Sequence, residues 1–462
     1  MEILLNKIKK YIPTKLFKAM QPAYHFLLSF CASALCGWPS SKIIVIGVTG
    51  TTGKTTAVYL IAKMFASAGY KAGFTSTAIF NDGKKEWLNN KKMTMPGRFF
   101  TQRMLKKMVK NKCQYAIIET TSQGIEQFRH KFINYDILVF TGLYPEHIEA
   151  HGSFENYKRA KSKLFAHLKQ CKTKYSNDKK FVVKAENGFK KISANRVKKT
   201  IIANGDDKYA DYFMDFWAEE KLFYSKEKRA GAVEYGDIKS EKSGVSFKIG
   251  GDEVKLNLLG EYNAANAMSA VCAGLSQGVG LEKIKSGLEK ISGVPGRMEV
   301  IKNADSDFIA IVDYAYEPEA LRNAYDAVLK LEHNKIIHVL GSAGGGRDAA
   351  RRPKLGEVAG QNADFAIITN EDPYDEDPAI IIDQVADGAI VAGKIENENL
   401  FKIQDRREAI KKALSLAGIG DIVLITGKGC EQAICAANGV KIPWDDRKEV
   451  ENELKNLSNN KK

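Results

Sequence analysis

The fold of the first half of the chain is decided by the segment Ile43-Ile44-Val45-Ile46-Gly47-Val48-Thr49-Gly50-Thr51-Thr52-Gly53-Lys54-Thr55-Thr56. Its first four residues are apolar and β-branched, which is typical of a parallel strand covered on both faces. The glycines that follow lack Cβ atoms, so the backbone can fold tightly around a ligand. Lys54 adds a cation, Thr55 adds a hydroxyl, and the N–H groups at the start of the next helix face the same point. The segment therefore predicts a strand, a polyphosphate-binding loop and a helix.

The glycine spacing is a variant of the usual phosphate-binding loop. That loop has a glycine five residues before the glycine of its Gly-Lys pair, whereas Val48 takes that position here and Gly47 precedes it. A glycine-rich turn that binds no ligand is the alternative. The sequence Gly-Lys-Thr directly after a strand favours the phosphate site.

The composition is that of a globular protein with roughly two to four domains. Its 462 residues are 44% hydrophobic and 27% charged. The net charge of +15 is spread along the chain, and fits either an enzyme that handles polyanions or a solvated basic surface. No segment resembles a nucleic-acid-binding module, so we expect no nucleic acid partner. The seven cysteines are scattered and lack zinc-finger spacing, which predicts a reducing, cytoplasmic compartment.

The N-terminal residues 1–41 are basic and then apolar. Lysines at 7, 9, 10, 15 and 18 precede an apolar run at 23–38, which is short for a membrane span. We interpret these residues as an amphipathic helix pair packed on the first domain. The alternative is an anchor at a membrane surface, peripheral to its inner face and near anionic lipid.

Two further strands are predicted to carry polar residues to the phosphate loop. Strand 115–118 ends at Glu119, and strand 137–140 precedes a polar loop that contains His147. Ligands gather at the carboxyl ends of parallel strands, so we expect both side chains beside the loop. The alternative is that Glu119 and His147 are ordinary polar residues at strand ends.

The remainder of the chain predicts a second α/β unit. Residues 173–260 show short strands at 245–249 and 254–258, and we interpret them as an irregular edge of the central domain. After Pro295-Gly296, which resembles a linker, strands are predicted at 308–312, 336–340, 365–369 and 422–426. Their alternation with helices argues for a parallel sheet. We therefore expect an α/β protein with an extension at 1–41, a central domain at 42–295 and a C-terminal domain at 296–462.

A series of ordered motifs connects these parts: Gly47-Val-Thr-Gly-Thr-Thr-Gly-Lys-Thr55, Glu119-Thr-Thr-Ser-Gln-Gly124, Glu146-His-Ile-Glu-Ala-His-Gly152, Ala160-Lys161, Gly260-Glu-Tyr-Asn-Ala-Ala-Asn266, Val294-Pro-Gly-Arg297, Asp313-Tyr-Ala315, Arg351-Arg-Pro353, and Gly427-Lys-Gly429 with Glu431. With them, residues 43–450 resemble the Mur ligases, ATP-dependent amide ligases of peptidoglycan precursor synthesis. The resemblance is greatest to the MurE type, which adds the third amino acid to UDP-N-acetylmuramoyl-dipeptide. It implies a P-loop-type central domain and a Rossmann-like C-terminal domain.

The chemistry that the resemblance implies agrees with the residues. An amide is made from a carboxylate through an acyl phosphate, which ATP supplies and an amine attacks. Phosphoryl transfer depends on positioning and charge neutralisation, so Lys54 would hold the terminal phosphates while Thr55 and Glu119 hold a first Mg2+. His147 would help to hold a second Mg2+. Lys161 aligns with a carbamylated lysine of the family, which would support that second ion.

The resemblance also assigns binding residues. The nucleotide-binding residues are Gly50, Thr51, Thr52, Gly53, Lys54, Thr55, Thr56, Asn263, Asn266, Arg297 and Asp313. The residues for the muramoyl-peptide and the free amino acid are Thr94, Thr121, Ser122, Gln127, Arg129, Arg347, Asp372 and Glu431. Among these, Gln127 and Arg129 would contact the muramoyl-peptide, Arg347 the incoming α-carboxylate, and Glu431 the incoming amino group.

Two departures from the family pattern concern the substrates. The 42 residues before Ile43 are too few for the domain that usually holds the UDP group, so the acceptor's carrier stays open: UDP, a lipid or neither. The motif that selects diaminopimelate becomes Glu371-Asp372-Pro373-Tyr374, which lacks an arginine for the distal carboxylate. Diaminopimelate is therefore disfavoured. Lysine would find acidic partners in Asp372, Asp375 and Glu376, unless that acidic loop is simply solvated.

Two other functions stay open at this point. One is a related ligase for an acid without UDP, of the folylpolyglutamate or cyanophycin type. The other is a non-catalytic nucleotide-binding protein anchored at the membrane by its N-terminus. The presence of Lys54, Glu119, His147 and Lys161 together argues against the second.

Overall fold

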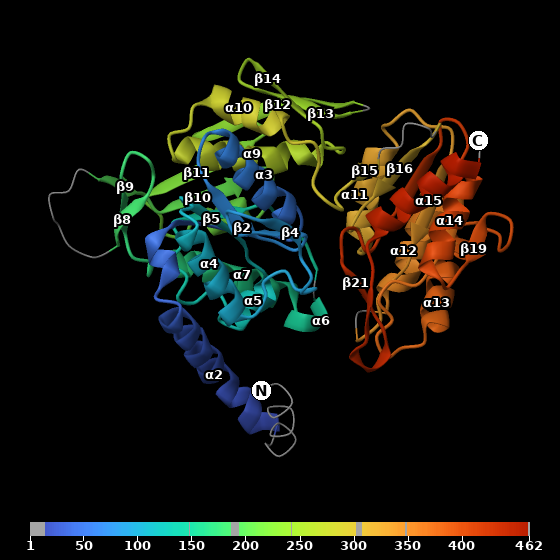
Figure 1. Ribbon diagram of the computed structural model, residues 1–462, viewed down its shortest axis with the longest axis horizontal. Coiled ribbons are helices and arrows are strands. Elements are labelled where there is room, and N and C mark those ends of the chain that lie inside the picture. The colour runs from blue at the N-terminus through green and yellow to red at the C-terminus, as the bar shows by residue number, and fades with distance from the viewer. Residues whose placement is uncertain are drawn as a thin grey trace.

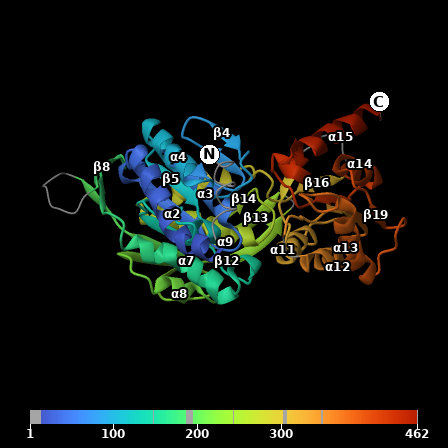
Figure 2. The ribbon, with the colours of Figure 1, turned by 90° about the horizontal axis from the view of Figure 1, so that it is seen from below.

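The computed structural model describes residues 14–146, 148–185, 194–241, 243–301, 307–346 and 349–460. These residues form two α/β lobes side by side, the first coloured blue to yellow and the second orange to red (Figures 1 and 2). A long helix, α2 (Thr14–Leu35), leads through a short 3-10 helix, η1 (Pro39–Lys42), into the first lobe. The α/β class predicted from the sequence is confirmed.

The first lobe is built on an 11-stranded sheet in the order β14-β13-β12-β11-β10-β6-β1-β5-β2-β3-β4. The strands from β12 to β2 in this order run parallel, and an antiparallel hairpin ends the sheet at each side. The bounds are β1 (Ile44–Thr49), β2 (Ala72–Thr75), β3 (Ile79–Asn81), β4 (Glu86–Leu88), β5 (Tyr115–Glu119), β6 (Ile137–Phe140), β10 (Thr200–Asn204), β11 (Glu220–Ser225), β12 (Ala232–Glu241), β13 (Gly244–Ile249) and β14 (Asp252–Leu256).

Helices cover both faces of this sheet, as the apolar first strand predicts. Alternate residues of β1 point to opposite faces: Ile44 and Ile46 belong to one apolar core, and Val45 belongs to the other. The first core lies under α3 (Lys54–Ser67), α9 (Tyr262–Ser276) and α10 (Leu281–Glu289). The second lies under α4 (Arg98–Lys110), α7 (Phe154–Leu168) and α8 (Ala210–Met214). The short helices α5 (Ser122–Glu126) and α6 (Ile148–His151) follow β5 and β6.

The segment interpreted as an irregular edge is more regular than expected. Its strands β13 and β14 do lie at the edge of the sheet, but β10 pairs with β6 near the centre. A separate three-stranded sheet, β8-β7-β9, is formed by β7 (Lys174–Ser176), β8 (Val182–Ala185) and β9 (Asn195–Val197). The strand β10 was missed because Thr200–Asn204 is short and follows a Lys-rich stretch that hides its apolar pattern.

The second lobe has a six-stranded sheet in the order β15-β16-β20-β17-β18-β19, in which β15 is antiparallel to its neighbour. Its strands are β15 (Glu299–Ile301), β16 (Ile309–Val312), β17 (Ile336–Leu340), β18 (Phe365–Ile368), β19 (Leu400–Lys402) and β20 (Ile422–Ile425). Its helices are α11 (Pro318–Val328), α12 (Arg351–Asn362), α13 (Pro378–Val391), α14 (Arg406–Leu416) and α15 (Asp446–Asn460). A hairpin of β21 (Ala433–Cys435) and β22 (Lys441–Pro443), with η2 (Ala437–Gly439) at its turn, lies on the side of this lobe that faces the first (Figure 1).

The four strands predicted for the second lobe are all present. In the part of the chain that the structure describes, no helix is both long enough and apolar enough to cross a membrane.

Candidate active site

The glycine loop lies between β1 and α3, as predicted. Gly53 has a positive φ of 76°, and a Cβ atom at this position would lie 2.3 Å from the Oδ1 atom of Asn266. A side chain is therefore excluded both by the backbone conformation and by the close approach of α9. A Cβ atom at Gly50 would lie 2.0 Å from the Thr141 hydroxyl oxygen. The loop thus takes its compact shape from contacts with two other segments of the lobe.

Glu119 lies at the carboxyl end of β5, next to this loop. In the parallel register it pairs with Val48, one residue before the end of β1. Its buried carboxylate accepts a hydrogen bond from the Thr55 hydroxyl at 3.0 Å. Thr55 and Glu119 therefore lie next to each other, as predicted. Their side chains present a hydroxyl and a carboxylate, and Mg2+ prefers oxygen ligands of this kind.

Thr77, which the sequence reasoning missed, holds Glu119 from the other side. Its N–H donates to Oε2 at 2.7 Å, and its hydroxyl lies 2.9 Å from Oε1. The same hydroxyl lies 2.9 Å from that of Thr94, a predicted substrate residue. The signal in the sequence was that a polar Ser76-Thr77 pair follows a short apolar strand, which ends at the same edge of the sheet as β1.

Lys161 lies under the glycine loop from α7. It is buried, donates from Nζ to the Gly50 carbonyl at 2.7 Å, and its Nζ lies 4.5 Å from the centre of the Tyr157 ring. Burial first, and then the positive charge of Lys54, holds the pKa of Lys161 well below its usual value, although Glu146 and Glu119 act in the opposite direction. The lowered pKa increases the share of the neutral amine, which is the nucleophilic form of this group.

Lys54 bends back onto its own loop. Its Nζ donates to the Thr51 carbonyl at 2.6 Å, while the Thr51 hydroxyl lies 3.2 Å from the Tyr157 hydroxyl. The ammonium therefore lies at the loop that it is predicted to serve. His147 is outside the described residues. In the same segment, His151 Nε2 lies 3.0 Å from the hydroxyl of Ser122, another predicted substrate residue.

The two predicted adenine-binding asparagines lie on α9. Asn263 donates to the Leu259 carbonyl at 2.8 Å, and Asn266 donates to the Asn263 side-chain oxygen at 2.8 Å. Both are buried, and Asn266 touches the glycine loop at Gly53. Asn266 therefore packs against the loop, and Asn263 orients the Asn266 side chain.

Arg297 and Asp313 belong to the second lobe. Arg297 lies just before β15, and Asp313 lies just after β16. Asp313 accepts hydrogen bonds from the N–H groups of Met298 at 2.8 Å and Ala315 at 2.7 Å. The Arg297 guanidinium lies 4.3 Å from the centre of the Tyr314 ring and donates to the Gly296 carbonyl at 2.9 Å. Both residues thus stand at the start of the second lobe, as predicted from the linker.

The remaining predicted substrate residues lie in two groups, one near Arg129 in the first lobe and one around Asp372 between the lobes. Arg129 donates to the Gln127 side-chain oxygen at 2.6 Å and to the Met95 carbonyl. Burial lowers the pKa of Arg129 to about 10. Thr121 caps α5 by accepting the Gly124 N–H at 3.1 Å. Arg347 lies outside the described residues.

Asp372 and Glu431 lie in a cluster that joins the two lobes. Lys92 of the first lobe contacts Asp372 at 2.6 Å and Glu431 at 3.2 Å, and donates to the Ala433 carbonyl at 2.8 Å. Lys428 contacts the same two carboxylates at 2.9 and 2.6 Å. Burial would raise the pKa of Asp372, but the charges of Lys428 and Lys92 outweigh it and hold that pKa below its usual value.

The neighbouring acidic residues also have protein partners. Glu376 pairs with Arg352 at 2.7 Å, and Asp375 accepts the Asn438 N–H at 2.7 Å. Both carboxylates therefore have a partner within the protein, although Asp375 is exposed and Glu376 is partly exposed. Lys92 was missed because its partners lie up to 341 residues away in the sequence.

Comparison with known proteins identifies the family. The model of the Mur ligase middle domain matches residues 48–196 and 187–274, and that of the Mur ligase glutamate ligase domain matches residues 296–429. The chain belongs to the Mur ligase family. The predicted family is thereby confirmed, and this Mur ligase is an ATP-dependent, ADP-forming amide ligase.

Several relatives of this Mur ligase match most of its length. A UDP-N-acetylmuramyl-tripeptide synthetase of Roseiflexus is 35% identical over 444 residues, 94% of this chain and 83% of that protein. A UDP-N-acetylmuramoyl-L-alanyl-D-glutamate–2,6-diaminopimelate ligase of Clostridium acetobutylicum is 32% identical over 85% of this chain and 74% of that protein. A solved 2,6-diaminopimelate ligase structure is 28% identical with a TM-score of 0.58, covering 90% of this chain and 79% of the other.

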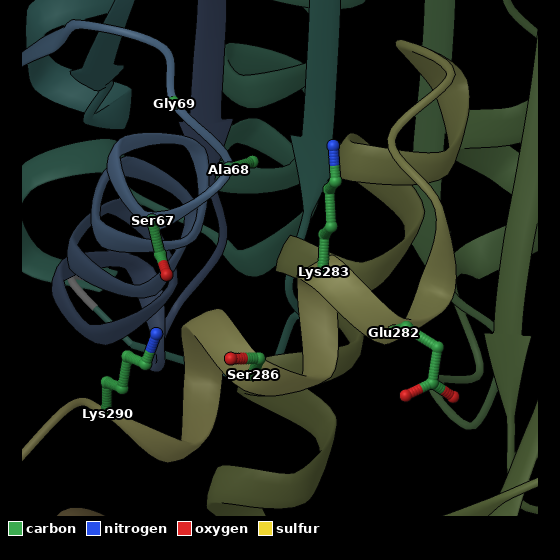
Figure 3. Close-up of a pocket in the computed structure, with 7 residues that line it drawn as sticks. All are labelled: Ser67, Ala68, Gly69, Glu282, Lys283, Ser286 and Lys290. Carbon is green, nitrogen blue, oxygen red and sulfur yellow. The ribbon is translucent and has the colours of Figure 1, made fainter.

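A surface hollow of this Mur ligase lies between the end of α3 and α10 (Figure 3). It has a volume of about 350 Å³ and is lined by Ser67, Ala68, Gly69, Glu282, Lys283, Ser286 and Lys290. It opens at the last residue of α3, whereas Lys54 is the first, so roughly 20 Å of helix separates it from the predicted phosphate site. We assign it no part in the reaction.

Proposed function

We propose that this Mur ligase is of the MurE type and joins an amino acid to a muramoyl-peptide through an acyl phosphate, with ATP converted to ADP. We propose that it is organised as an extension at 1–41, a central domain at 42–295 and a C-terminal domain at 296–462. The observation that supports the function best is the convergence of Lys54, Glu119 and Lys161 on the glycine loop of a chain whose relatives include tripeptide synthetases.

The residues at the loop suit Mg2+ and ATP. Thr55 and Glu119 offer one hydroxyl and one carboxylate, and Mg2+ is commonly held by one or two carboxylates plus phosphates and water. When bound, the ion would neutralise charge on the phosphates. Thr77 keeps the carboxylate turned toward Thr55, and Lys54, which now donates to the Thr51 carbonyl, would hold a terminal phosphate when ATP is bound.

Lys161 is proposed to react with carbon dioxide. The neutral amine nitrogen attacks the carbon atom, a N–C bond forms, and one proton leaves, which yields a carbamate with one negative charge. The buried position and the depressed pKa of Lys161 support this role, because an ammonium group cannot attack. The carbamate would lie at the Gly50 carbonyl side of the loop, where His147 is proposed to assist with a second Mg2+.

The acceptor is proposed to bind near Arg129. Its Nε atom is buried and makes no hydrogen bond with any described residue, which leaves a donor for an anionic group of the muramoyl-peptide. Gln127 orients the guanidinium. Thr94, which touches Thr77, and Ser122, which touches His151, are proposed to line the path between the acceptor and the loop.

The added amino acid is proposed to be one other than diaminopimelate. Tyr374 stands where the diaminopimelate motif has an arginine, and Lys92 with Lys428 already neutralises the carboxylates of Asp372 and Glu431. An incoming ammonium group would therefore bind by displacing Lys92. Arg347 is proposed for the incoming α-carboxylate.

The experiment is a substrate screen read by ADP release. UDP-linked and lipid-linked muramoyl-dipeptides are each paired with the standard amino acids and with diaminopimelate. We expect ADP release with at least one pair, and its loss in Lys54→Ala but not in Lys63→Ala, a lysine of the same helix that pairs with Glu86 at the surface. ADP release with a folate or cyanophycin primer, and with no muramoyl-peptide, would contradict the proposal.

A further inference from the structure

Helix α2 is packed with its polar side inward. Ser29 donates to the Phe128 carbonyl at 2.8 Å and accepts from Arg98 Nε at 3.1 Å, and His25 Nδ1 lies 2.6 Å from the Arg98 guanidinium. Ser33 donates to the Phe132 carbonyl at 3.3 Å. The helix is thus held against the first lobe by these hydrogen bonds together with ring contacts of Phe26 and Phe30 to Phe132.

The opposite side of α2 is apolar and exposed. Met20, Leu27 and Leu35 are 57%, 60% and 74% exposed. They follow the helical spacing of one face, which lies opposite His25 and Ser29. Aromatic side chains extend this surface; they are Tyr24, Phe26, Phe30 and Trp38, and the last three contact the Phe132 ring edge-on. Figure 1 shows α2 standing out from the body of the first lobe.

The sequence that leads into α2, and the helix that packs beside α2, are rich in cations. The sequence contains no acidic residue between Glu2 and Asp82, whereas lysines occur at 7, 9, 10, 15 and 18. Helix α4, which packs beside α2, also lacks acidic residues. It exposes a row of cations, namely Arg103, Lys106, Lys107 and Lys110.

We propose that the outer side of α2, defined by Met20, Tyr24, Leu27, Phe30 and Leu35, binds an anionic phospholipid surface. Apolar and aromatic side chains beside clustered cations are the composition of helices that lie in a membrane interface. Each Lys or Arg near such a surface adds attraction to anionic headgroups. A second copy of the chain would bring the same cations together across the contact, which like charges oppose. The inference goes beyond amide ligation and does not depend on it.

The test is sedimentation of the full chain with vesicles. One set contains equal parts of phosphatidylglycerol and phosphatidylcholine, and the other contains phosphatidylcholine alone. We expect binding to the anionic set that weakens as salt is raised. The double variant Leu27→Glu/Leu35→Glu should bind about tenfold or more weakly, because two exposed apolar side chains no longer enter the interface. Val391→Glu, an 83% exposed apolar position in the second lobe, is the matched control and should bind like the unmodified protein.

A further variant separates the charge from the apolar contribution. Lys106→Glu/Lys107→Glu should weaken binding to anionic vesicles. Light scattering of the same samples reports the oligomeric state. Absence of vesicle binding, or binding that both double variants leave unchanged, would overturn the proposal. So would a dimer that Leu27→Glu/Leu35→Glu dissociates in the absence of vesicle binding, because the occupant of the surface would then be a second copy.

Discussion

Glu119 is held on two sides beside the glycine loop. Its two carboxylate oxygens accept from the Thr55 hydroxyl and from both the N–H and the hydroxyl of Thr77, at 2.7–3.0 Å. A buried carboxylate held on two sides has little freedom to turn away from a cation. At the scale of single residues, the site is therefore defined as much by what orients Glu119 as by Glu119 itself.

Replacing Glu119 with Gln should reduce ADP release by at least about a hundredfold. The amide keeps the size of the side chain but loses the negative charge that Mg2+ requires. The measurement is ADP release as a function of Mg2+ concentration, and the variant should need more Mg2+ for half-maximal activity. Glu86→Gln, at a surface pair with Lys63, is the control. A Mg2+ dependence equal to that of the unmodified enzyme would refute the assignment.

Carbamylation of Lys161 should be visible without turnover. Protein equilibrated with 13C-labelled bicarbonate is expected to show a carbamate carbon signal, which Lys161→Arg abolishes because the arginine side chain does not carbamylate. Lys163→Arg, an exposed lysine of the same helix, should retain the signal. Lys161→Arg should also lower ADP release by about 10- to 100-fold. A signal that persists in Lys161→Arg would place the carbamate elsewhere.

Among the helices, α7 links the reaction site to the pH dependence of stability. It carries Lys161 below the glycine loop and, nearer its end, His167, whose Nε2 lies 3.1 Å from the Ile133 carbonyl. Burial first, and then Lys131, lowers the pKa of His167 to about 4. The ring also packs edge-on against His130, whose pKa burial lowers as well. One helix therefore carries both the buried Lys161 and a buried neutral imidazole.

The unfolding free energy should fall as the pH drops from 6.5 to 4. Between these values unfolded His167 binds a proton and folded His167 does not, so the unfolded state binds more protons and stability rises with pH. The full difference is about 3 kcal/mol. His167→Gln should make the pH dependence shallower, measured from urea unfolding at several pH values. Equal slopes for the unmodified protein and His167→Gln would exclude this contribution.

At the scale of the whole molecule, the two lobes meet through a few specific contacts. Lys92 bridges Asp372 and Glu431, and the Cys430 thiol lies 4.0 Å from the Ala78 carbonyl. The Lys92 side chain is 7% exposed, so its charge is poorly screened by solvent. The same contact joins the lobes at the carboxylates proposed for the incoming amino acid.

Lys92→Met should loosen the contact between the lobes. The backbone N–H of Cys435 donates to Asp372 at 2.7 Å, so its hydrogen exchange reports this region. Exchange should accelerate by about tenfold, because one charged hydrogen-bond partner of Asp372 is lost while Lys428 remains. Lys91→Met, at the exposed neighbouring position, is the control. Unchanged exchange in Lys92→Met would show that the pair does not hold the lobes together.

The sequence by itself determined the features that depend on local patterns. The β-branched run before the glycines fixed β1 and its loop, because a buried parallel strand and a tight phosphate turn both need those residue types. The apolar runs that end at Glu119 and Asp313 fixed β5 and β16 in the same way. The ordered motifs fixed the family.

The tertiary structure alone decided which distant residues meet. Thr77 reaches Glu119 across 42 residues, and Lys92 reaches Asp372 across 280, and no local pattern encodes such pairings. Pairing depends on the strand order and on how the lobes close. The sequence likewise did not predict that the apolar side of α2 faces outward. An amphipathic pattern indicates that a helix has a polar and an apolar side, but not which of them packs against the protein. Here hydrogen bonds from Ser29 and Arg98 decide it, and they leave the apolar side exposed.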